Sequence, residues 1–464
     1  MSGPLRTGKI IDGFELEKRI QAGGMGALWG VRHPQYKIPL IMKFPLIRYG
    51  DDSTAIVGFE VEQMILSKLS GPHVPKFIAA RDFSDRPYLV MERITGGALL
   101  DQLGKAPLSV EEVLSIGARV AWAIHSLHKQ DVIHLDIKPS NIMFRESGEA
   151  VLIDFGFAHH NRLPDLLAEE FSIPMGTRTY ISPEQIMRIR TEPKSDLFAL
   201  GILLYHLITG KRPFNDPTTE HGMRRRLYMD PLPPRARNPK CPAYLQELIL
   251  KCLEVEPKNR PETAAEVGFL LQNPAQVVLT SRSTKLTRDP FLKRAKRWIR
   301  SLGENSPEFP KQGKSKDHAP IVVVAVDLSA KGQPITEKLK EIAHQTLQTL
   351  PGARLACVSV LKVRHLAIDT PVDRKGRNLH VVQLGQLKHW ASQLDWPAER
   401  ITYHVLVAPD PAKALLDYAR TNHVDHIVMG ARGSSAIRRY LGSVSAKVVA
   451  QALCTVTVIR LGQK

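Results

Sequence analysis

Hydrophobic and polar positions follow different patterns in the first and last parts of the chain. Near the start, an apolar run at residues 14–20 predicts a strand, residues 59–69 repeat apolar positions at helical spacing, and residues 88–94 form another apolar strand. From residue 320 onward, strand-like runs alternate with helix-like segments. The first of these runs, residues 321–327, is largely β-branched, which is typical of a parallel strand buried on both faces.

This alternation predicts an open, doubly wound α/β sheet in the C-terminal part of the chain. Ligands bind such sheets beyond the carboxyl ends of the strands, where Asp327 and Gly430 both fall. The expected strands are residues 321–327, 354–361, 402–407, 426–429 and 455–459, and the expected helices are residues 335–350, 379–394 and 411–423.

Between the two patterns, residues 273–318 have the composition of a basic linker. Within it, residues 289–302 gather apolar side chains on one face of a helix and Lys or Arg on the rest, with Asp289 as a cap and Pro290 at the first position. Such a helix can dock its apolar stripe onto a neighbouring domain, lie on an anionic membrane surface or bind a partner.

Composition narrows the class of protein. The chain of 464 residues has room for two to four domains, and 43% hydrophobic with 24% charged residues is typical of a soluble globular protein. The net charge of +18 favours acidic partners in general. We expect no specific nucleic-acid partner, because no zinc finger, aromatic RNA-binding motif or DNA-reading helix is apparent.

The sequence also indicates a cytoplasmic location. No apolar run approaches the eighteen residues of a membrane span, and the N-terminus lacks an apolar signal core. The four cysteines, Cys241, Cys252, Cys357 and Cys454, are scattered without metal-type pairs, so we expect reduced thiols.

The segment His-Leu-Asp-Ile-Lys-Pro-Ser-Asn at residues 134–141 is followed by Asp-Phe-Gly at residues 154–156. Phosphoryl transfer from a nucleotide requires a carboxylate that holds the attacking hydroxyl. It also requires a second carboxylate and an amide oxygen that hold metal ions against the phosphates. Asp136, Asp154 and Asn141 supply this set in the order and spacing of protein kinases.

On these motifs, residues 14–272 resemble the bacterial branch of the eukaryotic-type Ser/Thr protein kinases. The resemblance implies a bilobal α+β fold, ATP with Mg²⁺ or Mn²⁺ as cofactors, and protein Ser/Thr hydroxyls as acceptors. It implies that Asp136 is the catalytic carboxylate and that Lys138 neutralises charge on the transferred group. It also implies that Asn141 and Asp154 are metal ligands.

The same resemblance implies where ATP binds. Residues 21–29 resemble the glycine-rich loop over the phosphates, although Gln21 stands where the first glycine is expected. Ile41 stands where the family usually has alanine. The implied ATP-site residues are Gly23, Gly24, Gly26, the strand lysine Lys43, its helix partner Glu62, and Met91 and Glu92 at the start of the hinge.

Residues 176–184 resemble the family's Gly-Thr-x-x-Tyr-x-Ser-Pro-Glu segment, which receives the protein substrate. The resemblance implies a buried ion pair between Glu184 and Arg260. It further implies that Asp196 bonds the backbone of the catalytic loop and that Thr177 lies beside the catalytic lysine.

Leu135 stands where most such kinases have an arginine that clamps a phosphate on the activation segment. We therefore expect activity to depend little on phosphorylation of Ser172, Thr177 or Thr179.

Residues 428–445 resemble the nucleotide-binding loop of universal stress proteins, and the resemblance extends over residues 319–462. The loop between the second and third glycines is one residue shorter than is usual in that family. A domain that binds ATP and a domain that keeps only the fold both remain open, and the family implies a homodimer through the last strand. The implied nucleotide contacts are Asp327, Gly430, Gly433, Gly442 and Ser443.

Three hypotheses follow for function. The first is a Ser/Thr protein kinase that also phosphorylates itself, with a C-terminal domain for nucleotide sensing or dimerisation. The second is a pseudokinase scaffold, which Gln21, Ile41 and Leu135 favour. The third is a stress-responsive adaptor whose essential activity lies in the C-terminal domain.

Overall fold

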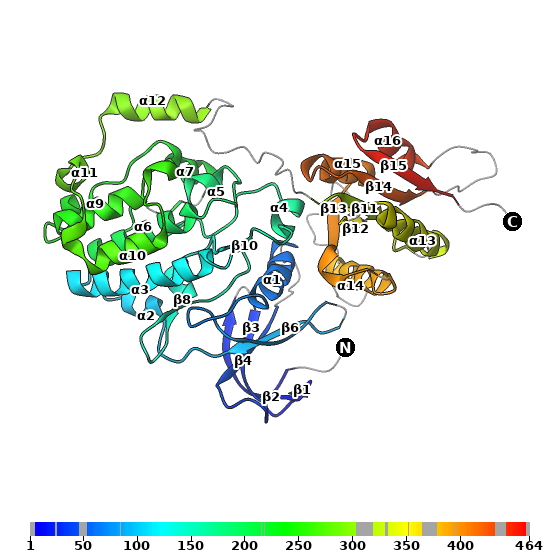
Figure 1. The fold of residues 1–464 in the computed structure, drawn as a ribbon, viewed down its shortest axis with the longest axis horizontal. Helices are drawn as coiled ribbons and strands as arrows, with labels where there is room; N and C mark the ends of the chain where they lie inside the picture. The colour runs from blue at the N-terminus through cyan, green and yellow to red at the C-terminus, as the bar shows by residue number, and fades with distance from the viewer. Residues whose placement is uncertain are drawn as a thin grey trace.

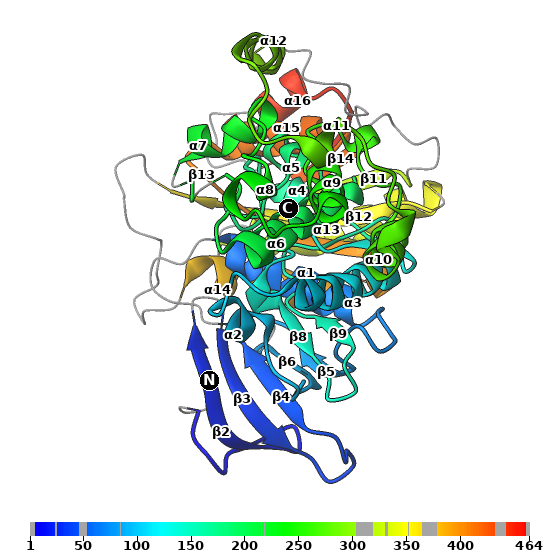
Figure 2. The ribbon, with the colours of Figure 1, turned by 90° about the vertical axis from the view of Figure 1, so that its left-hand side faces the viewer.

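Two domains lie side by side in the computed structural model of the chain (Figure 1). Figure 2, turned by 90°, looks onto the N-terminal domain with the C-terminal domain behind it. The structure describes residues 5–23, 26–45, 53–83, 85–214, 216–217, 219–302, 319–329, 333–350, 352–363, 378–394, 396–431 and 442–460.

An antiparallel sheet in the order β1-β2-β3-β4-β6-β5 forms one lobe of the N-terminal domain. Side chains alternate between its faces, so that Val90 packs in a small cluster on one face while Leu89 and Met91 join the main core on the other. The strands are β1 (Ile10–Ile11), β2 (Phe14–Gly23), β3 (Gly26–Arg32), β4 (Leu40–Phe44), β5 (Phe77–Arg81) and β6 (Tyr88–Glu92).

Helix α1 (Ser53–Leu66) packs on this sheet and begins and ends earlier than the predicted helix at residues 59–69. Only Ala55 in it is exposed, and both ends of the helix bury apolar side chains such as Ile56 and Ile65. A helix covered on all sides has no polar face, and so its periodicity marks its bounds poorly.

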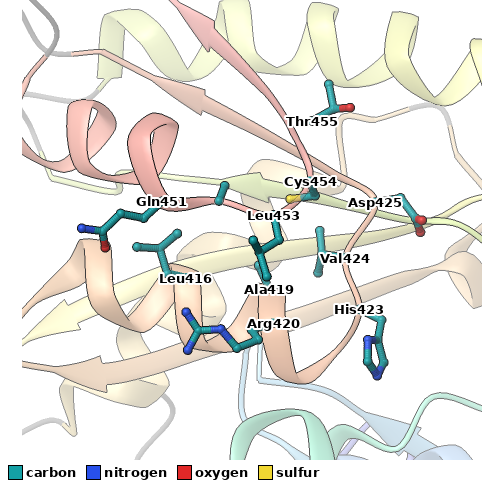
Figure 3. A pocket seen from close by; sticks show the side chains of 11 residues that line it. Leu416, Ala419, Arg420, His423, Val424, Asp425, Gln451, Leu453, Cys454 and Thr455 are labelled. Atoms are coloured by element: carbon teal, nitrogen blue, oxygen red, sulfur yellow. The ribbon is translucent and has the colours of Figure 1, made fainter.

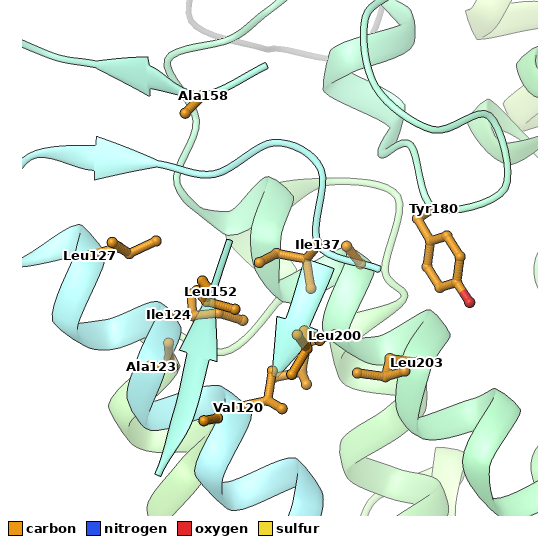
Figure 4. Packing of buried hydrophobic residues seen from close by; sticks show 14 of the residues in the cluster. Val120, Ala123, Ile124, Leu127, Ile137, Leu152, Ala158, Tyr180, Leu200 and Leu203 are labelled. Carbon is orange, nitrogen blue, oxygen red and sulfur yellow. The ribbon is translucent and has the colours of Figure 1, made fainter. Parts of the chain in front are cut away.

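The second lobe is helical and contains the largest part of the core. Figure 4 shows Ile124 of α3 and Leu200 of α6 converging on Leu152 and Ile137. The helices are α2 (Leu99–Leu103), α3 (Val110–His128), α4 (Leu166–Glu170), α5 (Pro183–Ile186), α6 (Lys194–Thr209), α7 (Glu220–Arg224), α8 (Pro234–Arg237), α9 (Ala243–Cys252), α10 (Ala264–Gln272), α11 (Ser281–Thr284) and α12 (Phe291–Leu302).

Short strands and 3₁₀ turns complete the lobe. The strands are β7 (Val132–Ile133), β8 (Ile142–Phe144), β9 (Ala150–Leu152) and β10 (His159–His160). The turns are η1 (Pro139–Asn141), η2 (Arg225–Leu227), η3 (Pro257–Asn259) and η4 (Pro274–Gln276).

The first part of the region predicted as a linker packs against the helical lobe. The Thr280 hydroxyl donates to Glu247 Oε1 at 2.9 Å, and Gln246 Nε2 donates to the Ser283 carbonyl at 3.2 Å. Ser283 is buried. These contacts place residues 280–285 with the helical lobe.

Helix α12 lies along the outside of the N-terminal domain, where Figure 1 shows it apart from the rest of the lobe. Arg297 faces the domain, because its Nη2 donates to Asp289 Oδ2 at 2.7 Å and its Nη1 lies 3.9 Å from Asp230 Oδ1. The apolar side of the helix faces away, with Leu292 81% and Ile299 63% exposed. The expectation that the apolar stripe docks onto a neighbouring domain is therefore wrong.

The C-terminal domain is an open sheet of five parallel strands in the order β13-β12-β11-β14-β15. Helices α13 and α14 cover one face, whereas α15 and α16 cover the other. This confirms the predicted doubly wound fold. The elements are β11 (Ile321–Ala325), α13 (Gln333–Thr349), β12 (Arg354–Lys362), α14 (Leu379–Ala391), η5 (Ala398–Arg400), β13 (Ile401–Ala408), α15 (Pro411–Thr421), β14 (His426–Gly430), α16 (Ser443–Gln451) and β15 (Thr455–Ile459).

All four cysteines are free thiols, as expected, and burial raises the pKa of Cys241 and Cys252 to about 12. Across the described residues, no helix has both the length and the apolar character needed to cross a membrane.

Candidate active site

The loop that carries Asp136 is anchored from below by α6. Asp196 accepts hydrogen bonds at 2.9 Å from the backbone N–H groups of His134 and Leu135. The His134 ring is in turn 3.1 Å from the carbonyl oxygen of Ile153. The prediction that Asp196 bonds this loop is confirmed, and the loop is tied to the segment that carries Asp154.

Asp136 lies at the centre of a polar cluster and is 2% exposed. Its Oδ1 accepts from the Thr177 N–H at 2.8 Å, and its Oδ2 accepts from Lys138 Nζ at 2.7 Å and from Asn141 Nδ2 at 3.1 Å. Lys138 also donates to the Thr177 hydroxyl at 2.9 Å, which confirms the predicted neighbours. The cluster places a carboxylate, an ammonium group and Thr177, in the segment predicted to receive the protein substrate, within hydrogen-bond distance of one another.

Asn141 and Asp154 lie on adjacent backbone segments, because the Ile153 N–H donates to the Asn141 carbonyl at 3.0 Å. The Asn141 amide nitrogen donates to Asp136, and the amide oxygen accepts from the Ser140 hydroxyl at 3.2 Å and has a second lone pair for a metal ion. Oxygen donors from an amide and a carboxylate suit Mg²⁺ or Mn²⁺, with substrate phosphates completing the coordination. The residues therefore fit the implied metal.

Lys43 links β4 to two carboxylates. Its Nζ lies 2.6 Å from Glu62 Oε2 and 3.2 Å from Asp154 Oδ1. Burial alone lowers the pKa of Lys43, but the charges of Asp154 and Glu62 outweigh it and raise that pKa. Burial alone raises the pKa of Asp154, but Lys43 and Lys138 outweigh it and hold that pKa low. At neutral pH the site thus holds a charged ammonium beside an ionised Asp154.

For Glu62 two effects oppose each other, since burial raises its pKa and Lys43 lowers it. The 2.6 Å contact with a lysine that stays protonated argues for a charged Glu62. Burial without a partner would neutralise the carboxyl instead.

The Asp-Phe-Gly segment is held in one arrangement. Asp154 has a left-handed φ of 66°, a conformation that non-glycine residues seldom adopt outside functional sites. Phe155 is 1% exposed and packs against the His134 ring with centroids 5.2 Å apart. With Phe155 in the core, Asp154 is turned toward Lys43.

The predicted hinge residues follow β6. Met91 is buried and pairs with Ile41 across the β4–β6 ladder. The Glu92 carboxylate is held by Arg145, with Oε2 3.0 Å from Nη2, and by the Lys76 N–H at 3.1 Å. The side chain of Glu92 therefore anchors the hinge, and adenine recognition by backbone groups stays a prediction.

The glycine-rich loop is a hairpin in which Gly23 pairs with Gly26. Gly24 lies outside the described residues. A Cβ atom at Gly26 would lie 2.7 Å from the Phe44 carbonyl oxygen, so packing against β4 alone requires glycine there. The role of these glycines at phosphates remains a prediction.

The activation segment is held without a phosphate clamp. Glu184 and Arg260 form the predicted pair, with Oε1 2.6 Å from Nη1 and Oε2 2.8 Å from Nη2, and both side chains are fully buried. Leu135 is buried and apolar. Sequence reasoning missed Gln185, which follows the recognised motif and whose Nε2 bridges the carbonyls of Leu135 at 2.8 Å and Met175 at 2.9 Å.

In the C-terminal domain, the predicted nucleotide contacts have structural partners. Asp327 Oδ1 accepts from the Ser329 N–H at 3.1 Å, which caps the turn after β11. A Cβ at Gly430 would lie 2.8 Å from Ile335 of α13. Gly442 and Ser443 begin α16, and Gly433 lies outside the described residues. Nucleotide binding by this domain stays a prediction.

The C-terminal domain also has a hollow of about 750 Å³ (Figure 3). Its lining includes Val424 and Asp425 before β14, and Leu453 and Cys454 before β15. It therefore lies at the amino ends of the strands, opposite the edge where such sheets bind ligands. It is also distant from the Asp136 cluster in the chain and in the fold, so it is no part of the candidate active site.

Comparison with known proteins agrees with this geometry. Residues 14–268 match the model of the protein kinase domain, and residues 320–460 match that of the universal stress protein family. A "probable serine/threonine-protein kinase" of Clostridium perfringens is 32% identical over 60% of this chain and 41% of its own length. PknB of Mycobacterium tuberculosis and PrkC of Bacillus subtilis are 28% and 29% identical over 56% of this chain.

The chain spans about two-fifths of the length of these relatives. Among solved structures, the PknI kinase domain of Mycobacterium tuberculosis has a TM-score of 0.46 and 21% identity, covering 58% of this chain and 99% of that one. By its sequence match over residues 14–268, the chain belongs to the protein kinase family, and it carries a universal stress protein domain at residues 320–460.

Proposed function

We propose that the whole chain transfers the γ-phosphoryl group of ATP to Ser or Thr hydroxyls of proteins, including its own. The observation that carries the proposal is the cluster in which Asp136 contacts Lys138, Asn141 and the Thr177 N–H at 2.7 to 3.1 Å. This cluster brings a carboxylate for the attacking hydroxyl next to an amide and a segment that receives protein substrates.

Each residue then has a distinct role. Asp136 orients the substrate hydroxyl and accepts its proton, and Lys138 stabilises charge on the transferring group. Lys43, held by Glu62, binds the α- and β-phosphates. Asn141 and Asp154 would hold Mg²⁺ or Mn²⁺, which neutralises phosphate charge when bound.

The pseudokinase alternative rests on Gln21, Ile41 and Leu135. None of these side chains carries the chemistry of transfer. Asp136 and Asp154, to which the proposal gives that chemistry, are both present, and each contacts a lysine: Lys138 at 2.7 Å and Lys43 at 3.2 Å, respectively.

The four free thiols and the need for ATP support a cytoplasmic location.

Labelled ATP with Mg²⁺ or Mn²⁺ and a generic basic substrate tests the proposal. Transfer should fall by at least about a hundredfold in Asp136→Ala and Asp154→Ala, because each removes a group on which the reaction depends. Exposed Asp101→Ala, in α2, is the matched control and should retain activity. Unchanged transfer in Asp136→Ala, or none in the wild type, would contradict the proposal.

We further propose that α12 rests on anionic membrane surfaces. Its apolar side chains Leu292 and Ile299 point away from the protein, Lys296 is exposed beside them, and no acidic residue occurs within the helix. Apolar insertion combined with attraction to anionic lipid is how such helices bind membranes.

Co-sedimentation of the full chain with vesicles tests this contact. Vesicles of phosphatidylserine and phosphatidylcholine should bind the wild type, and vesicles of phosphatidylcholine alone should not. Leu292→Glu should abolish binding, whereas Leu279→Glu, at an exposed leucine outside α12, should retain it. Equal binding to neutral vesicles would count against the proposal.

We also propose that the chain forms a homodimer through β15. β15 is an edge strand of the sheet, and the exposed Leu453 and Val449 lie beside it. Edge strands with apolar neighbours favour pairing with a second copy. Sedimentation at micromolar concentration should show a dimer that Leu453→Glu dissociates.

A further inference from the structure

The universal stress protein domain covers the outer side of α1, the helix that carries Glu62. Lys388 of α14 is ion-paired with Glu60 of α1, with Nζ 2.5 Å from Oε1, and lies 3.4 Å from Asp82 Oδ2. The side chains of Lys388 and Glu60 are 11% and 10% exposed, respectively. Glu60 is two residues from Glu62, so a contact on the outer side of α1 is one turn or less from the catalytic ion pair.

Aromatic rings and apolar side chains surround this ion pair. The Lys388 ammonium lies 5.9 Å from the centroid of the Phe83 ring and 5.3 Å from that of Tyr403. Phe83 packs edge to face on Phe59 of α1, with ring centroids 5.8 Å apart. Leu384 of α14 belongs to the same buried cluster as these rings. The near-complete burial of α1 is therefore shared between both domains.

A second contact holds α4, which follows the Asp-Phe-Gly segment in the activation segment. The buried His404 of β13 lies between two carboxylates, with Nδ1 2.9 Å from Glu170 Oε1 and Nε2 3.1 Å from Glu169 Oε2. Arg354 of β12 lies 2.8 Å from Glu169 Oε1, and the Tyr418 hydroxyl donates to Glu169 Oε2 at 3.0 Å.

The charges across this interface are complementary. The kinase domain contributes acidic groups and the C-terminal domain contributes cationic ones, which favours one defined register of docking. The acidic groups are Glu60, Asp82, Glu169 and Glu170, and the cationic ones are Lys388, Arg354 and His404.

Both contacted elements reach the catalytic residues. On its inner side, α1 presents Glu62 to Lys43 and meets the Asp-Phe-Gly backbone, because a Cβ at Gly58 would lie 3.1 Å from the Gly156 carbonyl. Helix α4 packs on α1. With the domain docked, the Lys43–Glu62 and Lys43–Asp154 contacts are both formed.

We infer that the universal stress protein domain activates the kinase of the same chain by holding α1 and α4, with Lys388 and His404 as positioning residues that touch neither ATP nor substrate. Undocking would free α1 to move and would separate Glu62 from Lys43. The inference rests on the proposed transferase activity. The universal stress protein domain then acts as an activating domain within the same chain. A ligand or partner that detaches this domain would lower phosphoryl transfer.

A charge swap in the full chain tests this inference. Lys388→Glu places a carboxylate beside Glu60 and Asp82, and it should lower kcat by about tenfold, within the range of measured couplings between sites. Amide hydrogen exchange in residues 53–66 should speed up in the same variant. The double variant Glu60→Lys/Lys388→Glu should recover part of both, because it re-forms the pair with exchanged charges while Asp82 still faces a carboxylate. Lys413→Glu, at an exposed lysine of α15, should change neither.

Two results would overturn the inference. One is an unchanged kcat and unchanged exchange of α1 in Lys388→Glu. The other is a folded double variant that stays as impaired as the single one, because a pair that acts through its charges should work when the charges are exchanged. If the wild type transfers no phosphate, the proposed function fails. Amide hydrogen exchange of α1 in the same variants still tests whether the C-terminal domain holds this helix.

Discussion

Single buried charges decide much of this structure. Glu184 and Arg260 are both fully buried, and the carboxylate also accepts from the Ser195 hydroxyl at 2.7 Å. A buried pair gains little over an apolar pair, but removing one partner leaves the other desolvated without compensation. Removing one partner therefore lowers the free energy of unfolding by more than the intact pair contributes to it.

We predict that Arg260→Ala lowers the free energy of unfolding by about 3 to 5 kcal/mol, because Glu184 is left buried and unpaired. Urea unfolding followed by tryptophan fluorescence measures this. Arg32→Ala breaks an exposed pair with Glu15 and should change the stability little. Equal effects of the two variants would show that burial is not the cause.

At the scale of elements, Arg190 connects several parts of the segment that follows Asp-Phe-Gly. Arg190 Nε donates to Asp165 Oδ2 at 2.7 Å, and Arg190 Nη2 donates to the carbonyls of Phe157 and Ala158 at 3.1 Å. Burial alone raises the pKa of Asp165, but Arg190 and His159 outweigh it and hold that pKa well below its usual range. Leu135 is buried, and the Arg190–Asp165 ion pair is formed without any phosphate.

We predict that Ser172→Ala/Thr179→Ala retains kcat within about twofold, because Leu135 offers no charge to pair with a phosphate on this segment. Arg190→Ala should lower kcat, since it leaves Asp165 buried with a weaker partner. Steady-state transfer to a generic substrate measures both. Loss of activity in the first variant would mean that phosphorylation orders the segment.

At the scale of the whole molecule, the interface between the domains contains a buried histidine whose pKa is strongly raised. Burial alone lowers the pKa of His404, but the hydrogen bonds that it donates to Glu169 and Glu170 outweigh this effect and raise that pKa to about 9. Burial raises the pKa of Glu170 to about 6. Arg354 and Tyr418 also meet this cluster, and the charge of Glu60 acts on Glu170.

We predict that docking weakens as pH rises from 7 toward 10. The pKa of His404 is higher in the folded than in the unfolded chain, so its stabilisation is complete below about pH 6.5 and is lost as pH rises through about 9. A shift of this size is worth on the order of 3 kcal/mol. Thermal unfolding across this range should show the loss.

The matched control for this prediction is His221→Gln, at an exposed histidine, which should keep the wild-type pH dependence. His404→Gln should remove it. A wild-type melting temperature that is flat from pH 7 to 10 would exclude a charged His404 at the interface.

Contacts between residues that are close in the sequence could be predicted, whereas features that depend on tertiary burial could not. Lys138 and Asn141 lie within five residues of Asp136, so the sequence motif was enough to predict that these residues are neighbours. Strands of the C-terminal domain were readable for a similar reason, because a strand buried on both faces is apolar along its whole length. Helix α1 was misplaced at its ends because burial on every side removes the periodic signal.

The sequence by itself determined the two folds and the set of residues proposed for phosphoryl transfer, because local motifs and hydrophobic periodicity encode both. Only the tertiary structure decided that α12 turns its apolar side outward and that Lys388 meets Glu60. Lys388 lies in a helix where a lysine ordinarily faces solvent, and its burial depends on how a second domain docks. Contacts between domains depend on the shape and charge of two assembled surfaces, which no single stretch of sequence contains.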